Sequence, residues 1–370
     1  MGGAVLQSGR ADTLIGETKI MTLARQPYAV RPAMTLIELL VTVLVLMLLG
    51  TTIAPALGHL RGESKNDMSR ANLMQLGQAR DQYATDNDDR IFAYTWRAGE
   101  TYTMPDGRVK TPSSDQQAAA FQNSEILIRR TGRISGITKI FNFTARLLHR
   151  RYSHLIILDY LAKNDEDFNT TTVAIDPADQ NLLVWHERPL EYGQASGVPY
   201  ADGIRNGYDN DPNWLNIAIR QRWAFGSSYE IVPFAWQGDG PNDVYVPVSS
   251  TPHLFSARGN PQLGNRTMSE VAFPARKVHM HEDHDREIKR HLWFAYGTAR
   301  VEKLMFDGSL NARQSAESRP AENPAQPGQV WRQRYVPLDH FPIPRNGFSD
   351  NRELDMRFRW TQGGLQGIDY

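Results

Sequence analysis

The sequence predicts an α+β fold, in which a long N-terminal membrane-spanning α-helix packs on a large, mostly antiparallel β-rich head. Three observations predict it. An uncharged apolar run near residue 40 predicts a helix that starts in a membrane. The amphipathic pattern of residues 58–88 predicts that this helix continues with one apolar stripe. From about residue 90, short apolar runs alternate with Gly, Pro, Asn and Asp, which is typical of short strands and turns.

The composition is that of a globular protein, with 41% hydrophobic and 22% charged residues among 370. Lys plus Arg and Asp plus Glu both number 41, so the net charge is zero, which argues against a protein that coats nucleic acid. Because Cys is absent, disulfide frameworks, thiolate zinc sites and cysteine nucleophiles are excluded. A mean hydropathy of -0.49 excludes several membrane spans but allows one.

The apolar run is expected to cross a membrane. No Asp, Glu, Lys or Arg lies between Leu39 and Leu60. With Leu36 and Ile37 the run gives about twenty mainly apolar residues, the length that a bilayer core of about 30 Å requires. A secretory signal peptide is the alternative, but its apolar core is usually about 7–15 residues, and Glu38 stands where basic residues are usual.

The basic residues before the run predict its orientation. Arg25 and Arg31 are the two nearest, and no acidic residue opposes them. Under the positive-inside rule they keep the N-terminus in the cytoplasm. We therefore expect a single-pass protein of the inner (cytoplasmic) membrane with a periplasmic head, or a subunit of an extracellular or periplasmic filament.

Residues 58–88 predict an amphipathic helix that leaves the bilayer. Leu73, Leu76, Ala79 and Tyr83 recur at helical spacing, and polar residues lie between them. This apolar stripe needs a globular partner to cover it. The polar run 86–88 is expected to end the helix, because short polar side chains compete for the helical backbone.

The start of the apolar run resembles the processing site of type IV prepilins and type II secretion pseudopilins. The residues that carry the resemblance are Ala33, Met34, Thr35, Leu36, Ile37 and Glu38. The resemblance implies a cut between Ala33 and Met34 by a prepilin peptidase, followed by N-methylation of Met34. Gly-Phe is the commoner pair at the cut, so Ala-Met is a departure. Met21 is an alternative start to Met1.

The resemblance also implies an organisation for the chain. It divides into a leader (1–33), a transmembrane half (34–57) and an amphipathic half (58–88) of one helix, and a head (89–370). Pro55 falls where the family often places a helix-kinking proline. Two further segments, Asn72–Gly77 and Phe306–Ser309, are similar to segments of the large pilin-like proteins of planctomycetes.

Glu38 is unusual at the head of an apolar run. A carboxylate inside lipid costs about 2.5–3.5 kcal/mol even on the lenient insertion scale, so it needs a partner. In the family reading, the amine of Met34 in a neighbouring subunit is that partner, and the pair sets the stagger of a filament. The alternative is that Glu38 lies at the membrane interface without such a role.

The head is expected to hold many short elements. A strand, a turn and a second strand are predicted over Lys303–Leu310, a helix over Ser153–Leu161 and a loop over Ser315–Pro327. Further strands are predicted at Val173–Ile175, Leu182–Trp185, Tyr229–Trp236, Val244–Val248, Lys277–Met280 and Leu292–Tyr296.

Two clusters in the head are candidate metal sites. Alternation along a strand would place His279 and His281 on one face, near His284, where they could chelate a divalent metal. Asp209 and Asp211 lie in a Gly-rich loop with oxygen ligands that could take Ca²⁺. The alternatives are a solvated charged loop and ordinary turn chemistry. No cofactor is otherwise expected.

A basic stretch is a candidate nucleic-acid site. No Asp or Glu lies between residues 125 and 159, and aromatic residues that could stack on bases are interleaved. The same residues would suit a packed surface helix, so DNA is an unlikely partner. The candidate residues are Arg129, Arg130, Arg133, Arg150 and Arg151.

No phosphate loop, nucleophile elbow or paired-carboxylate motif stands out, so no enzyme is predicted. The expected function is a non-enzymatic pilin-like or pseudopilin subunit in a type IV pilus or type II secretion-like filament. Its expected partners are the peptidase/N-methyltransferase, other pilin-like subunits, the inner-membrane assembly platform and the lipid bilayer. The alternative is a membrane-anchored periplasmic or surface binding module that does not polymerise.

Overall fold

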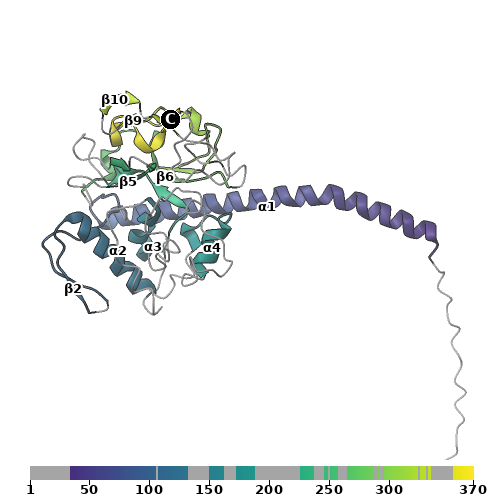
Figure 1. Cartoon of the computed structure of the whole chain (residues 1–370), viewed down its shortest axis with the longest axis horizontal. Coiled ribbons are helices and arrows are strands. Elements are labelled where there is room, and N and C mark those ends of the chain that lie inside the picture. Colours follow the sequence, from purple (N-terminus) through teal and green to yellow (C-terminus); the bar gives the residue numbers. More distant parts are fainter. Residues whose placement is uncertain are drawn as a thin grey trace, which may run out of the picture. The chain divides into compact units, whose positions relative to one another are not determined.

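The computed structural model describes the greater part of the chain. The described residues are 34–105, 107–131, 150–161, 172–187, 226–236, 246–248, 251–256, 265–286, 291, 293, 296–323, 326–330, 332–334 and 353–370. The chain divides into two compact units, Met1–Ala56 and Leu57–Tyr370. Every element labelled in Figure 1 other than α1 belongs to the second unit.

Helix α1 (Leu36–Asp86) is the longest element, with 51 residues. It ends in the predicted polar run. The Asn87 side-chain amide donates to the Tyr83 carbonyl at 2.8 Å, and Asp88 takes a left-handed conformation with φ of 54°. A polar side chain that bonds the last turn, followed by a left-handed residue, stops a helix.

The prediction that the first half of this helix spans a membrane is wrong. Within the residues that the structure describes, no helix is long and apolar enough to cross one. The aliphatic run Leu39–Leu49 covers only about 16 Å at about 1.5 Å per residue, roughly half of a 30 Å bilayer core. Gly50, Thr51 and Thr52 follow it and lower the apolar content. The described fold is a mixed helix-and-sheet structure.

The second unit is built around a four-stranded antiparallel sheet. Its order is β3 (Tyr229–Ile231), β6 (Val278–Glu282), β7 (Lys303–Met305) and β8 (Leu310–Asn311). All residues of β3, β6 and β7 are buried, so both faces of these strands are covered. The strand–turn–strand prediction at 303–310 is confirmed, and Gly308 supplies the left-handed turn residue with φ of 87°.

The second half of α1 covers this sheet. Leu73, Leu76, Ala79 and Tyr83 are buried, which confirms the predicted apolar stripe. Gly77 lies on the same side, and a Cβ built there would lie 3.2 Å from the Cδ1 atom of Leu304 in β7. A side chain at residue 77 would therefore require the Leu304 side chain to move by a few tenths of an ångström.

Short helices and two-stranded pairs complete the unit. In the view of Figure 1, α2, α3 and α4 lie on one side of the second half of α1, and β5, β6, β9 and β10 lie on the other. The helices are α2 (Asp115–Thr131), η3 (Arg150–Ile157), α3 (Leu158–Leu161), η5 (Thr172–Ala174), α4 (Gln180–Glu187), η8 (Pro233–Ala235), η9 (Met268–Glu270), η10 (Pro274–Arg276), η11 (Ser315–Glu317), η12 (Phe358–Trp360) and η13 (Gly364–Gln366). The antiparallel pairs are β1 (Tyr102–Thr103) with β2 (Val109–Lys110), β4 (Val246–Val248) with β5 (Thr251–Ser256), β9 (Glu322–Asn323) with β10 (Gln326–Val330), and β11 (Arg332–Arg334) with β12 (Glu353–Asp355).

Two predicted strands are helices. Val173–Ile175 falls largely in η5, and Leu182–Trp185 lies within α4. A short apolar run cannot be distinguished from a buried helical turn by periodicity alone. The signal that was missed is Asp179, whose carboxylate accepts a hydrogen bond from the Leu182 backbone N–H at 3.2 Å and so caps α4.

Other predictions in the head are partly correct. Strands β4 and β6 overlap the predicted Val244–Val248 and Lys277–Met280, and Ser153–Leu161 is helical, first as η3 and then as α3. The predicted strand Tyr229–Trp236 ends at Ile231, because Pro233 starts η8. The described residues of Leu292–Tyr296 form no strand, and the expected loop Ser315–Pro327 contains η11, β9 and the start of β10.

Gly77→Val should lower the free energy of unfolding of the head by about 1–3 kcal/mol, because the added methyl groups overpack Leu304. Gly62→Val is the matched control, since nothing lies within 4 Å of a Cβ at this other α1 glycine, and it should change stability by no more than about 0.5 kcal/mol. Chemical denaturation measures both. Equal effects would contradict the close approach of α1 to β7.

Candidate functional site

Thr35 and Glu38 form a capping box at the N-terminus of α1. The carboxylate Oε2 of Glu38 accepts hydrogen bonds from the Thr35 backbone N–H at 2.8 Å and from the Thr35 hydroxyl at 3.0 Å. In return, the Glu38 backbone N–H donates to Thr35 Oγ1 at 3.2 Å. These bonds lower the pKa of Glu38. The Thr-x-x-Glu spacing is the sequence signature of this motif, and the sequence reading above missed it.

An exposed apolar segment, Met34–Leu49, follows from this start. Its large hydrophobic side chains are between 42% exposed at Val43 and 79% exposed at Leu36. Soluble monomers rarely expose a continuous run of this kind, and such runs mark contact surfaces. The backbone of α1 continues through Pro55, the other predicted assembly residue, whose side chain lies outside the described set.

Buried polar contacts fix the second half of α1 to the sheet. The Ser69 hydroxyl donates to the Glu282 carboxylate and lies 2.9 Å from the Tyr229 hydroxyl. About three helical turns further along α1, the Arg80 guanidinium donates to the Met305 carbonyl at 3.0 Å. Because these groups are buried, each lost contact would leave a polar atom without water.

The histidines of β6 lie in apolar surroundings. The His279 ring contacts Phe92 and Phe306, with ring centroids 5.4 and 4.4 Å away. The His281 ring packs against Trp293 and Phe358, at 5.4 and 4.9 Å. Burial, and next the charge of a nearby arginine, lowers the pKa of both, well below its ordinary value for His279 and to about 3 for His281. Both rings are therefore neutral at pH 7.

Acidic residues near the end of β6 form ion pairs with one arginine, Arg286. The Arg286 guanidinium lies 3.3 Å from an Asp176 carboxylate oxygen, 3.0 Å from one of Asp179 and 2.5 Å from one of Asp283. His284 contacts the same Asp283 at 3.0 Å. This cluster joins the N-terminal end of α4 to the end of β6, which is a structural role.

The predicted metal sites find no support in the part of the chain that the structure describes. No three His, Asp or Glu side chains there come together in a way that could hold a metal ion. His279, His281 and His284 each contact the rings or charged groups given above. Asp209 and Asp211 lie outside the described residues.

The structure describes the side chain of only one of the predicted nucleic-acid-binding residues, Arg129. Arg129 lies in α2, where its guanidinium pairs with Glu125 at 3.0 Å and with Asp159 at 3.5 Å. These pairs tie α2 to α3 and direct the Arg129 charge to protein carboxylates. The side chains of Arg130, Arg150 and Arg151, and all of Arg133, lie outside the description.

The C-terminal segment is held to the sheet by two buried ion pairs. Arg359 pairs with Glu230 of β3, and Lys277, just before β6, pairs with Asp369 at 3.5 Å. All four side chains are almost fully buried. Sequence reading had no signal for these pairs, because the partners are far apart along the chain.

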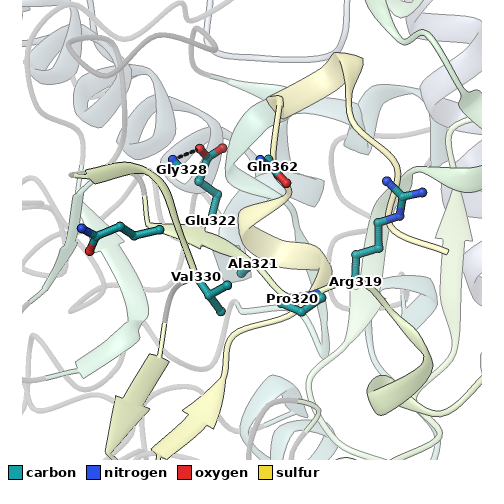
Figure 2. Close-up of a pocket in the computed structure, with 8 residues that line it drawn as sticks. Arg319, Pro320, Ala321, Glu322, Gly328, Val330 and Gln362 are labelled. Carbon is teal, nitrogen blue, oxygen red and sulfur yellow. Dashed lines mark hydrogen bonds between the residues drawn. The ribbon is translucent and has the colours of Figure 1, made fainter.

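A small pocket lies between β9, β10 and the C-terminal turn (Figure 2). The Gly328 backbone N–H donates to the Glu322 carboxylate within its lining, which also includes Arg319 and Gln362. Its volume is about 170 Å³. Small-molecule sites usually occupy about 300–1,000 Å³, so this pocket gives little support to a ligand-binding role.

Comparison with known proteins gave no match among family models, curated proteins or solved structures.

The neutral histidines predict a loss of stability in acid. The pKa of His281 is about 3 in the folded chain and about 6.5 when unfolded, so the unfolded chain binds more protons between these values. The contribution of each neutral histidine to the free energy of unfolding is therefore fully present above pH 6.5. Below pH 6.5 this free energy should fall by up to about 1.4 kcal/mol per pH unit for each such histidine.

His281→Phe should therefore reduce the decrease in stability between pH 6.5 and pH 5, a window above the ordinary pKa of carboxylates. Phe keeps the ring packing against Trp293 and Phe358 and removes the titrating group. Denaturation at several pH values measures the slope. A slope that is the same in wild type and variant would contradict the assignment.

Proposed function

We propose that this chain is a non-enzymatic, pilin-like subunit that assembles with other copies through its exposed apolar segment. The observation that carries the proposal is the exposure of aliphatic side chains from Met34 to Leu49 at the start of one long helix. The resemblance of residues 33–41 to the prepilin processing site supports it, because that family assembles through the corresponding helix.

A second copy of the same segment is the partner that fits best. Contact between two copies would bury aliphatic surface, at about 25 cal/mol for each Å² removed from water. A cut after Ala33 would give the segment a positive amine on Met34 beside the negative carboxylate of Glu38. Copies that are shifted along the helix axis could pair these charges. Such a contact is head-to-tail, and it builds an open filament when the rotation between copies does not close into a ring.

Glu38 can serve its own helix and a neighbour at once. Both hydrogen bonds from Thr35 end on Oε2, which leaves Oε1 of this exposed side chain for a donor from another copy. The capping bonds also fix the carboxylate at the start of the helix. A fixed acceptor loses less freedom when the neighbour's amine binds.

Processing and assembly require further partners. The proposal needs a prepilin peptidase/N-methyltransferase to cut between Ala33 and Met34, and an assembly platform. In the structure α1 begins at Leu36, two residues after Met34, so the proposed cut lies just outside the helix. The expected localisation in the inner membrane and the contact with lipid stay predictions.

The proposal predicts that the mature chain from its native host begins with N-methyl-Met34. Ala33→Arg should abolish the cut, because the peptidase site accepts only small side chains at this position. Mass spectrometry of the N-terminal peptide measures both. A variant processed like the wild type would contradict the cut site. A wild-type chain that keeps its leader and stays monomeric would favour the non-polymerising binding module.

Two variants separate the charge of Glu38 from its capping role. Glu38→Gln keeps a hydrogen-bond acceptor for Thr35 but removes the charge, whereas Thr35→Val removes the capping side chain but keeps the charge. If the charge pairs with a neighbour's amine, Glu38→Gln should raise the concentration needed for assembly, because the ion pair between copies is lost.

Thr35→Val should change assembly much less, because the carboxylate is still present. Sedimentation of the processed chains over a range of concentrations measures the effect. If Thr35→Val instead impaired assembly more than Glu38→Gln, the role of Glu38 would be limited to capping the helix. Leader removal must be checked in both, since an uncut chain lacks the amine.

A further inference from the structure

A lysine, a threonine and an aspartate meet inside the head, apart from the proposed assembly segment. Lys277 and Asp369 are 0% and 1% exposed, and Thr361 is 4% exposed. The Lys277 Nζ atom lies 3.5 Å from Asp369 Oδ1, and the Phe234 ring centroid lies 5.3 Å from Nζ. The site is buried and lined on one side by an aromatic ring.

The Thr361 hydroxyl connects the two charged groups. It accepts a hydrogen bond from Lys277 Nζ, and its single proton can be donated either to Asp369 Oδ1 or to the Phe358 carbonyl, 3.0 Å away. A proton can therefore pass from the ammonium to the carboxylate through this hydroxyl, which leaves a neutral amine and a neutral carboxylic acid. Burial disfavours two separate ions, and burial raises the pKa of Asp369.

The aspartate is fixed in place from three directions. Its backbone N–H donates to the Arg276 carbonyl at 2.9 Å, and its carbonyl accepts from the Arg319 N–H at 2.8 Å. Its second carboxylate oxygen, Oδ2, accepts a hydrogen bond from the Val278 backbone N–H at 2.8 Å. These bonds hold the Asp369 carboxylate next to Lys277, whose Nζ atom lies 3.5 Å from Oδ1, and a reacting group held in place beside its partner has a high effective concentration.

We propose that Lys277 and Asp369 form an intramolecular isopeptide bond in the folded head. The neutral amine of Lys277 attacks Cγ of Asp369, and the charge that develops on Oδ2 is stabilised by the Val278 N–H, in the manner of an oxyanion hole. Thr361 carries a proton from the attacking nitrogen to Oδ1. The C–Oδ1 bond breaks, one water molecule leaves, and an amide remains. The reaction needs no oxidant or other reactant.

The bond would join the residue before β6 to the C-terminal segment. It would close a loop of about ninety residues, and a cross-link over a loop of this length is expected to stabilise a fold by restricting the unfolded chain. The site lies within the second unit, so the inference does not depend on the proposed assembly function.

Peptide mass spectrometry of the full, folded chain tests the inference. Trypsin should release peptide 277–286 joined to peptide 360–370, lighter than the two separate peptides by one water molecule. This readout does not depend on processing at the N-terminus. Peptide 278–286, which trypsin releases only when Lys277 is unmodified, together with unlinked peptide 360–370 from folded wild-type protein would overturn the proposal and leave an ion pair only.

Three variants complete the test. Lys277→Arg keeps the positive charge but has no attacking amine, so it should give only separate peptides while the head still folds. Thr361→Val should slow formation of the linked peptide, because the proton relay is lost. Lys303→Arg changes another buried lysine of the sheet and should leave the linked peptide intact. A linked peptide in Lys277→Arg would also contradict the assignment.

Discussion

The close packing of the second half of α1 on strands β6 and β7 is the contact on which the rest of the head depends. It places Gly77 against Leu304 and buries an apolar stripe that the helix would otherwise present to water. The same packing removes water from Ser69, Arg80 and Glu282, which then require partners within the chain. The buried polar contacts of the sheet are a consequence of this approach, and they fix the register of helix and strands.

The two halves of α1 differ in what covers them, and this difference points to function. The stripe that includes Leu73 and Leu76 is buried in the head, whereas the aliphatic side chains of Met34–Leu49 are exposed. The histidines and carboxylates of the described core are used in packing and in ion pairs, so they form no open catalytic centre there. The exposed apolar segment is the surface on which the proposed assembly rests.

The sequence predicts those features that depend on local pattern. The stripe from Leu73 to Tyr83 and the β7–β8 hairpin are found, because helical spacing and Asp-Gly turn chemistry are local signals. The membrane span was predicted wrongly. The capping box of Thr35 and Glu38 was visible in the sequence but overlooked. The pairs Arg359–Glu230 and Lys277–Asp369 could not be predicted, because only the tertiary fold brings these residues together.

Disulfide trapping between copies tests the central claim most directly, because the natural chain has no cysteine. Leu44→Cys places one thiol in the exposed apolar segment, and Met74→Cys places one at an exposed position of α1 beside the head. On mild oxidation of the processed chain, we expect Leu44→Cys to give covalently linked copies and Met74→Cys to stay largely single. Equal cross-linking at both positions, or none at residue 44, would contradict assembly through this segment.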